Sequence, residues 1–279
     1  GDTLAIAAPE DKGPRQSSQA SGRVDIYRKT GSAWSLEARI LRPDSTVPVS
    51  FGRAMALDGD TLLVGAPMSS HSYDYYPERA YVYHRAGGVW SLQATLAQLP
   101  KVTVRSFGSA VALRGDLAIV GTDGMRMKKG DPIIRVFRRT GTAWKLESSI
   151  TAVAKTHDMF MDSSRDIENA MALSFDGTRL AVGLAYEGYT EAGINNRSGG
   201  VSIYRRAGTG WVLESHIVSP ASFVGEVGQS VCISGNTTLF TAGDEVWIYA
   251  LSGTRWSKQA GVDLPFGSYA SGQLTSLSL

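Results

Sequence analysis

A short segment recurs five times along this 279-residue chain, and the recurrence constrains the fold more than any other feature of the sequence. The clearest copy is Gly59-Asp60-Thr61-Leu62-Leu63-Val64-Gly65-Ala66-Pro67, a glycine-containing turn followed by an apolar run. The five copies begin at residues 1, 59, 115, 176 and 235, so the period is 56 to 61 residues. A fixed period predicts that one supersecondary unit is repeated along the chain.

Three further elements recur in phase with this segment. In the unit from 51 to 96, an apolar stretch at 51–57 precedes it, an aromatic stretch at 80–83 follows it, and a tryptophan segment closes the unit. The tryptophan occurs once in every unit, at Trp34, Trp90, Trp144, Trp211 and Trp256. Each unit therefore offers four strand candidates, and four-stranded units repeated radially form a β-propeller.

The second and fourth strand candidates differ in their hydrophobic pattern. The second is apolar almost throughout, so both of its faces are expected to be buried. The fourth alternates with a period of two, which is expected to place Trp90, Leu92, Ala94 and Leu96 on one face. Charged residues on the fourth strand are expected to lie on an exposed outer edge, where they discourage pairing with other chains. They include Glu37, Arg39, Lys145 and Glu147.

The sequence therefore predicts an all-β fold, a single β-propeller domain of about five four-stranded blades that spans residues 1–279. The approximate blades are 1–40 with 266–279, 51–96, 107–150, 167–217 and 227–261. Because the chain begins with a second strand, the C-terminal segment 266–279 is expected to supply the missing first strand and close the ring. A larger ring, of which this chain is a part, is the alternative.

Composition narrows the class of partner. The formal net charge is +2, which gives no reason to expect binding to nucleic acid, and no apolar run is long enough for membrane insertion. The one cysteine, Cys232, excludes an internal disulfide and is expected to be a small buried residue.

The unit from 51 to 96 carries Phe-Gly, Gly-Asp, Val-Gly-Ala-Pro and Tyr-Val-Tyr in that order, and it resembles the FG-GAP repeat family. The Trp-Ser-Leu-Gln segment is more similar to the bacterial secreted type than to the integrin α-chain propeller. The resemblance implies an extracellular or cell-surface binding module, and hence export, but no reaction. Integrin-type repeats often hold calcium between the first two strands, whereas these turns have too few oxygen ligands for it.

The two ends of each predicted blade differ. Connections from strand one to two and from three to four are short and uniform, as at 58–60 and 86–89. Connections from two to three and from four to one are long and dissimilar, as at 67–79 and 185–199. Long loops on a rigid scaffold are where binding usually resides, so the long-loop face is the predicted working face. In the fifth unit only Gly243 and Asp244 join strands two and three.

Two of the long connections hold clustered tyrosine, asparagine, arginine and histidine, which suit a polar ligand. The predicted ligand-binding residues are His71, Tyr73, Tyr75, Tyr76, Arg79, Tyr186, Tyr189, Asn195, Asn196 and Arg197.

No catalytic residue, metal ligand or cofactor is predicted. The histidines show no metal-ligand spacing and no Gly-x-Ser-x-Gly occurs, although a Ser-His-Asp triad built in space stays open. The acidic segment 158–168 resembles the start of a cation loop but lacks its glycine, and a solvated loop is the favoured interpretation.

These features favour a non-enzymatic extracellular module that binds a glycan or a protein through the long-loop face. One alternative is a scaffold or spacer domain in a larger adhesin, fibre or toxin. A second alternative is a propeller hydrolase or lyase.

Overall fold

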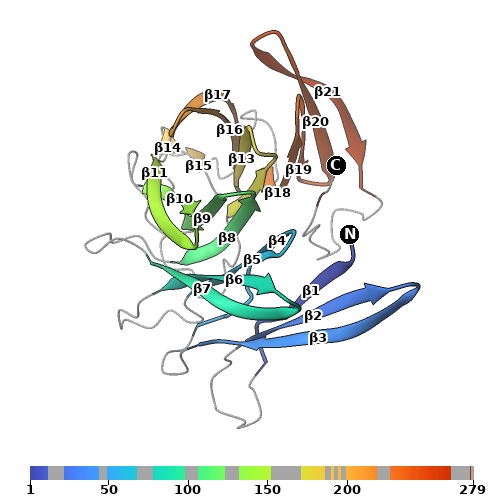
Figure 1. The fold of residues 1–279 in the computed structure, drawn as a ribbon. Helices are drawn as coiled ribbons and strands as arrows, with labels where there is room; N and C mark the ends of the chain where they lie inside the picture. The colour runs from blue at the N-terminus through green and yellow to red at the C-terminus, as the bar shows by residue number, and fades with distance from the viewer. Residues whose placement is uncertain are drawn as a thin grey trace. The chain divides into compact units, whose positions relative to one another are not determined.

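The computed structural model describes residues 1–11, 22–43, 49–67, 78–97, 106–122, 132–151, 171–185, 190–191, 194–195, 199–218, 227–264 and 277. These residues form strands and turns, with no helix among them. Apart from one two-stranded hairpin, the strands build five antiparallel sheets of three or four strands that follow one another along the chain (Figure 1). The five sheets are blades one to five below. The chain divides into two compact units, Gly1–Thr122 with Arg135–Glu147 and Asp123–Ile134 with Ser148–Leu279.

Each blade runs in chain order across its sheet. Blade one contains β1 (Thr3–Ala8), β2 (Arg23–Thr30) and β3 (Ala33–Leu41). Blade two contains β4 (Met55–Asp58), β5 (Thr61–Ala66), β6 (Arg79–Ala86) and β7 (Val89–Ala97). Blade three contains β8 (Phe107–Arg114), β9 (Leu117–Thr122), β10 (Pro132–Thr140) and β11 (Ala143–Thr151). Blade four contains β12 (Met171–Phe175), β13 (Arg179–Leu184), β16 (Gly200–Ala207) and β17 (Gly210–Val218). Blade five contains β18 (Val227–Ser234), β19 (Thr237–Ala242), β20 (Glu245–Ser252) and β21 (Arg255–Asp263).

This arrangement confirms the predicted fold class, an all-β protein built from five repeated sheets of the β-propeller type. Four sheets have four strands, while the sheet of β1, β2 and β3 has three among the described residues. Most of the segment predicted to supply its fourth strand, 266–279, lies outside the described residues. Closure of the ring therefore stays a prediction.

The short turns fold as their glycines predict. Gly59 and Gly115 both have φ near +57°, a left-handed conformation that non-glycine residues rarely adopt. A Cβ on either residue would meet nothing within 4 Å. Glycine is therefore needed there for its backbone conformation and not for space. In blade five, Gly243 and Asp244 alone join β19 to β20, as expected.

The motif glycines in the strands have a different role, close approach of neighbouring blades. A Cβ on Gly65 of blade two would overlap the carbonyl oxygen of Gly108 in blade three. Gly183 of blade four meets Gly228 of blade five in the same way. The glycine of Phe-Gly and the glycine of Val-Gly-Ala-Pro thus contact each other across adjacent blades, and their spacing in the sequence reflects this contact.

Apolar side chains fill the space between consecutive blades. Between blades one and two, Phe51 is fully buried beside Val24 and Ile26 and meets the rings of Tyr81 and Tyr83 edge-on, with centroids 5.7 and 6.4 Å apart. Similar clusters join blade two to blade three and blade four to blade five. The second strands of blades two and three are buried on both faces, as their composition predicts, since all six residues of β5 and of β9 are buried. In blade one the prediction is wrong, because β1 leaves Leu4 and Ile6 exposed.

A β-bulge in the outer hairpin overturns one expectation about the fourth strand. In blade two Tyr83 pairs with Leu92 and Val82 with Ala94, so Gln93 is the extra residue. Trp90 consequently packs toward blade one, whereas Ala94 and Leu96 pack toward blade three. The prediction that Trp90 and Leu96 share a face is wrong, because the extra residue reverses the alternation.

In blade one the extra residue of the bulge is Glu37, and it contacts the next blade. The expectation that Glu37 lies on an exposed outer edge is therefore wrong. Glu37 is three residues after Trp34, and its side chain is 13% exposed rather than on an open edge. Its carboxylate accepts hydrogen bonds from Arg85 Nη2 at 2.6 Å and from Trp90 Nε1 at 3.0 Å, both in blade two. At the next junction, Gln93 Oε1 accepts one from Trp144 Nε1 at 2.7 Å.

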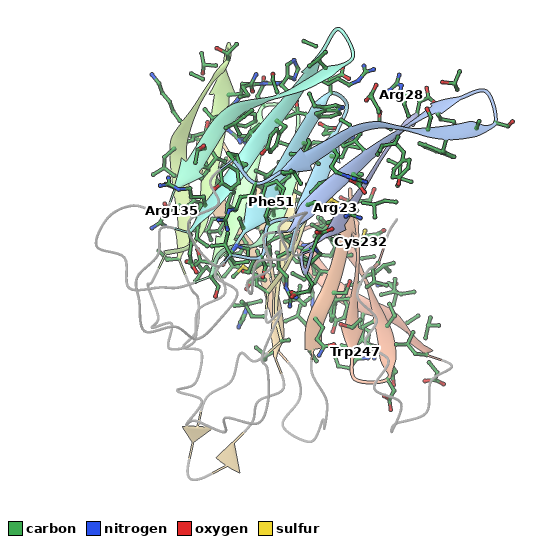
Figure 2. All side chains as sticks on the ribbon, turned by 90° about the horizontal axis from the view of Figure 1, so that it is seen from below. Arg23, Arg28, Phe51, Arg135, Cys232 and Trp247 are labelled. Carbon is green, nitrogen blue, oxygen red and sulfur yellow. The ribbon has the colours of Figure 1, made fainter. Side chains whose placement is uncertain are left out.

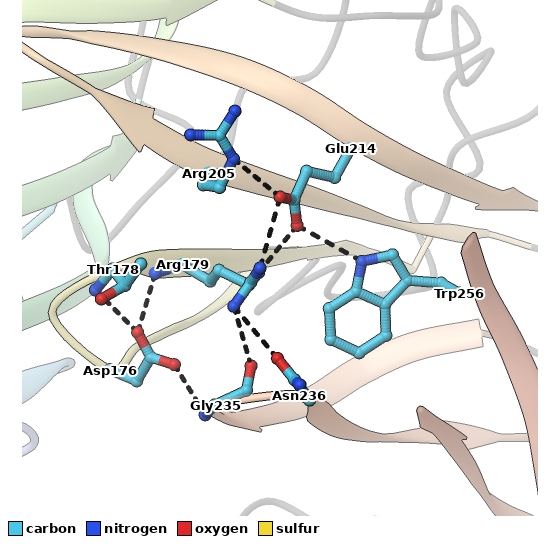
Figure 3. Close-up of polar contacts among 8 residues, drawn as sticks. All are labelled: Asp176, Thr178, Arg179, Arg205, Glu214, Gly235, Asn236 and Trp256. Atoms are coloured by element: carbon cyan, nitrogen blue, oxygen red, sulfur yellow. Dashed lines mark hydrogen bonds and ion pairs between the residues drawn. The ribbon is translucent and has the colours of Figure 1, made fainter. Parts of the chain in front are cut away.

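The second unit repeats this Trp–Glu contact. Glu214 Oε2 of blade four accepts a hydrogen bond from Trp256 Nε1 of blade five at 3.4 Å (Figure 3). Two arginines of blade four also bind Glu214, Arg179 through Nε at 2.7 Å and Arg205 through Nε at 2.9 Å. A carboxylate with three donors around it fixes the tryptophan of the following blade, so Trp256 has a structural role, as Trp90 and Trp144 do.

Candidate binding face

The short-turn ends of the blades are bonded to one another. Asp58 Oδ2 accepts a hydrogen bond from the backbone N–H of Gly115, in the equivalent turn of the next blade, at 2.6 Å. In the second unit Asp176 Oδ2 accepts one from Gly235 N–H at 2.8 Å (Figure 3). These turn carboxylates therefore bind the neighbouring backbone. Their role is structural.

Most of the predicted ligand-binding residues fall outside the described part of the chain. Those outside are His71, Tyr73, Tyr75, Tyr76, Tyr186, Tyr189, Asn196 and Arg197. Arg79 is described as the first residue of β6, and its backbone carbonyl lies beside Gly108 of blade three. Asn195 is described only through its backbone. Whether these ten residues form one site therefore stays a prediction.

The connection at 185–199 contains regular structure that the sequence did not reveal. Strands β14 (Thr190–Glu191) and β15 (Ile194–Asn195) pair antiparallel, with Thr190 opposite Asn195 and Glu191 opposite Ile194. The predicted loop thus carries a two-stranded hairpin. Neither strand is long enough to show a hydrophobic period, which is why sequence patterning misses it.

Buried charge gathers at the long-connection ends of blades one to three. Four charged residues are buried among the described residues, namely Asp25, Arg42, Glu78 and Arg135. Each lies close to the point where its strand meets a long connection. Figure 2 shows the two ends within one strand: Arg28 lies near the short turn of blade one, and Arg23 lies at the opposite end. Buried charge is destabilising unless it is paired or used, so this distribution distinguishes the two ends physically.

In blade one the buried carboxylate of Asp25 is paired with two arginines. Asp25 accepts hydrogen bonds from Arg39 Nε at 2.8 Å and lies 3.3 Å from Arg23 Nε, and Arg23 also pairs with Asp11. The hydrogen bond from Arg39 is the largest influence on Asp25 and, with the charge of Arg23, holds its pKa below the usual range despite burial. These four residues form a continuous chain of alternating charge.

In blade two the buried carboxylate binds backbone. Glu78 accepts hydrogen bonds from the N–H of Ser106 at 2.7 Å and of Phe107 at 2.9 Å, immediately before the Phe-Gly motif of blade three. Ser106 is the one described non-glycine residue with positive φ, at 69°. A carboxylate that accepts two backbone N–H groups compensates the strain of that conformation and orders the entry to β8.

Arg135 of blade three has no such compensation. Its side chain is 2% exposed, and neither Nε nor Nη1 has a hydrogen-bond partner among the described residues. Burial lowers the pKa of the guanidinium. Sequence analysis missed this residue, although a signal exists: Arg135 stands two residues before the strand-three aromatic, where blade two has Tyr81.

One buried Ser–His pair is relevant to the Ser-His-Asp triad that the sequence left open. Ser202 Oγ lies 2.9 Å from His216 Nδ1, and burial lowers the pKa of His216. Ser202 is buried at 2% exposure, and a Ser–His pair alone does not make a catalytic triad. In the described ranges no three residues of the histidine, cysteine, aspartate or glutamate types gather as metal ligands; residues 152–170, which include the acidic segment 158–168, lie outside those ranges.

Comparison with known families supports the class of protein that the blades define. A family model described as FG-GAP repeat matches residues 34–83, from the tryptophan of β3 to the tyrosine of β6. With the five repeated sheets, this match confirms the resemblance to FG-GAP β-propellers, a fold that suggests a binding or scaffold module. No curated protein matches the chain.

FG-GAP repeats are typical of extracellular proteins. The described residues include no helix that is long and apolar enough to cross a membrane.

Proposed function

We propose that this chain is a non-enzymatic extracellular recognition module that binds a glycan or protein ligand through the long connections of its blades. The observation that carries the proposal is the asymmetry of the blades. At one end, Asp58 and Asp176 each accept a hydrogen bond from the backbone N–H of a glycine in the next turn. At the other end, connections of unlike length and sequence leave from strands whose ends hold the buried charges.

Rigid strand ends favour this function because the groups they carry need little further ordering when a ligand binds. The tyrosines at 73, 75 and 76 would supply flat, amphipathic contact area at low entropic cost. Arg79, at the start of β6, attaches this connection to a blade that is buried on both sides. The connection at 185–199 is a second contributor and is tested separately.

The test begins with ligand selection on a glycan array and on a library of displayed extracellular proteins. The triple variant Tyr73→Ala, Tyr75→Ala and Tyr76→Ala is then expected to bind the selected ligand at least about thirtyfold more weakly, since one hot-spot tyrosine contributes about 2 kcal/mol. Unfolding temperature should remain within about 1 °C of the parent.

The matched control changes three exposed residues at short turns, Val89, Thr142 and Thr209, to alanine. This control should keep the parent affinity. Loss of the ligand by the control and not by the tyrosine variant would assign binding to the short-turn ends. Absence of any ligand would favour a scaffold domain, and turnover on a panel of polysaccharides would favour a hydrolase or lyase.

A further inference from the structure

Arg135 lies in the apolar layer that blade three shares with blade two. Phe137, two residues further along β10, packs against Leu63 and Val82 of blade two. Side chains two residues apart on a strand share a face, so Arg135 also faces blade two. Figure 2 shows Arg135 at the end of its blade away from the short turns.

The guanidinium of Arg135 is charged and incompletely satisfied there. Arginine stays protonated in proteins even when burial lowers its pKa, as it does here. Both Nε and Nη1 are buried without an acceptor in the part of the chain that the structure describes. A buried cation with unfilled donors destabilises the fold, and it is retained where a partner completes it.

The residues at the same strand position in the other four blades have partners for hydrogen bonding or packing. Asp25 is paired with Arg39, Ser202 lies within hydrogen-bonding distance of His216, and Trp247 Nε1 donates to Glu245 at 2.7 Å. Tyr81 packs edge-on against Phe51. At this strand position, blade three is therefore the one described blade in which a charged side chain is left with buried donors that lack an acceptor.

We propose that Arg135 binds a carboxylate of an acidic protein segment, which enters from the long-connection end between blades two and three. The planar fork of a guanidinium matches a carboxylate through two parallel hydrogen bonds. A carboxylate at the tip of a flexible aspartate or glutamate side chain can reach a group that is 2% exposed, whereas a carboxylate fixed to a sugar ring needs an opening as wide as the ring. This inference rests on the proposed function and specifies the class of ligand.

The first test needs no ligand. Arg135→Met replaces the charge by an apolar side chain of similar length, so it should raise the unfolding temperature by at least about 2 °C. Lys145→Met, which removes an exposed cation from the same blade, should leave it unchanged. A lower unfolding temperature for Arg135→Met means that the guanidinium is already paired within the protein, which overturns the proposal.

The second test uses tetraglutamate as the probe, with tetraglutamine as the neutral control, by calorimetry at constant ionic strength. The parent chain and Lys145→Met should bind tetraglutamate, Arg135→Lys should bind it about tenfold more weakly, and Arg135→Met should not bind it. Retained binding by Arg135→Met overturns the proposal. Tighter binding of trigalacturonate than of tetraglutamate also overturns it and points to an acidic glycan.

The experiments distinguish a failure of this inference from a failure of the proposed function. If tetraglutamate does not bind while the tyrosine variant still loses its selected ligand, this inference is wrong and the proposed function stands. If Arg135→Met loses tetraglutamate while the tyrosine variant keeps its selected ligand, the carboxylate site stands and the role of the 67–79 connection is wrong.

Discussion

The two ends of a blade differ in how far their residues recur from blade to blade. At the short-turn end a contact between neighbouring turns is repeated: Asp58 binds the N–H of Gly115, and the same contact returns in the second unit with Asp176 and Gly235. At the long-connection end the equivalent positions are filled differently in every blade, by Asp25, Tyr81 and Arg135 in the first three. In a repeat protein, the residues that hold neighbouring units together recur from unit to unit. Residues outside these contacts can differ between units and can take part in function.

The largest expected loss of stability comes from a substitution where two neighbouring blades approach closely. Gly65→Ala places a methyl group against the carbonyl of Gly108, where neither backbone can yield. We expect a loss of at least about 3 kcal/mol in unfolding free energy, measured by urea denaturation.

Gly115→Ala is the control for that substitution, because its Cβ would meet open space and only its φ of 56° opposes the change. It should cost about 1 kcal/mol. Equal losses at the two glycines would mean that backbone conformation, and not contact between blades, explains the motif.

The next effect concerns the Trp–Glu contact. Glu37→Ala leaves Arg85 and Trp90 without their common acceptor, and we expect a loss of about 2–3 kcal/mol because all three side chains are largely buried. Lys145→Ala, at an exposed position of a fourth strand, should change stability by less than about 0.5 kcal/mol. A similar small change for Glu37→Ala would show that this residue is an edge charge after all.

A smaller effect should appear as acid lability. Hydrogen bonds from Arg85 lower the pKa of Glu37, and at Glu214 burial opposes the shift but the bonds from Arg179 prevail, so both pKa values lie below the usual range. A lowered folded-state pKa adds stability above the unfolded pKa of about 4.3, and that stability is lost as the pH falls through the folded values.

The unfolding temperature of the parent should therefore fall steeply as the pH drops below about 4. The double variant Glu37→Gln and Glu214→Gln should be less stable at pH 7 and show a shallower decline in acid. An unchanged slope would mean that other carboxylates, such as Asp25, account for the acid lability.

The five-unit architecture could be predicted because its signals are local. Gly59 and Gly115 mark turns that require a left-handed residue, and apolar runs such as Leu62–Val64 mark strands buried on both faces. The bulge at Gln93 could not be seen in the hydrophobic pattern of one strand, since one inserted residue only reverses the alternation. Alignment of the units contains the missing signal: glutamate or glutamine follows every column tryptophan by three residues, as at Glu37 and Gln93.

The candidate site could be predicted only in part. Connection lengths and clustered tyrosines point to one end of the blades, but which side chains converge depends on contacts between segments far apart in the chain. Arg135 illustrates the limit. Its sequence context, Ile-Ile-Arg-Val-Phe, is an ordinary strand with one polar residue. What distinguishes Arg135 from an exposed arginine is that its Nε and Nη1 are buried with no acceptor among the described residues.

Hydrogen–deuterium exchange with and without the selected ligand tests the division between the two ends most directly. Bound ligand should slow exchange in peptides that cover 67–79 or 185–199 and the strand ends beside them. Peptides confined to the short turns at 58–60, 86–89 and 114–116 should exchange at the same rate in both states. Protection concentrated in those turns, with none in the long connections, would contradict the assignment of function to the long-connection end.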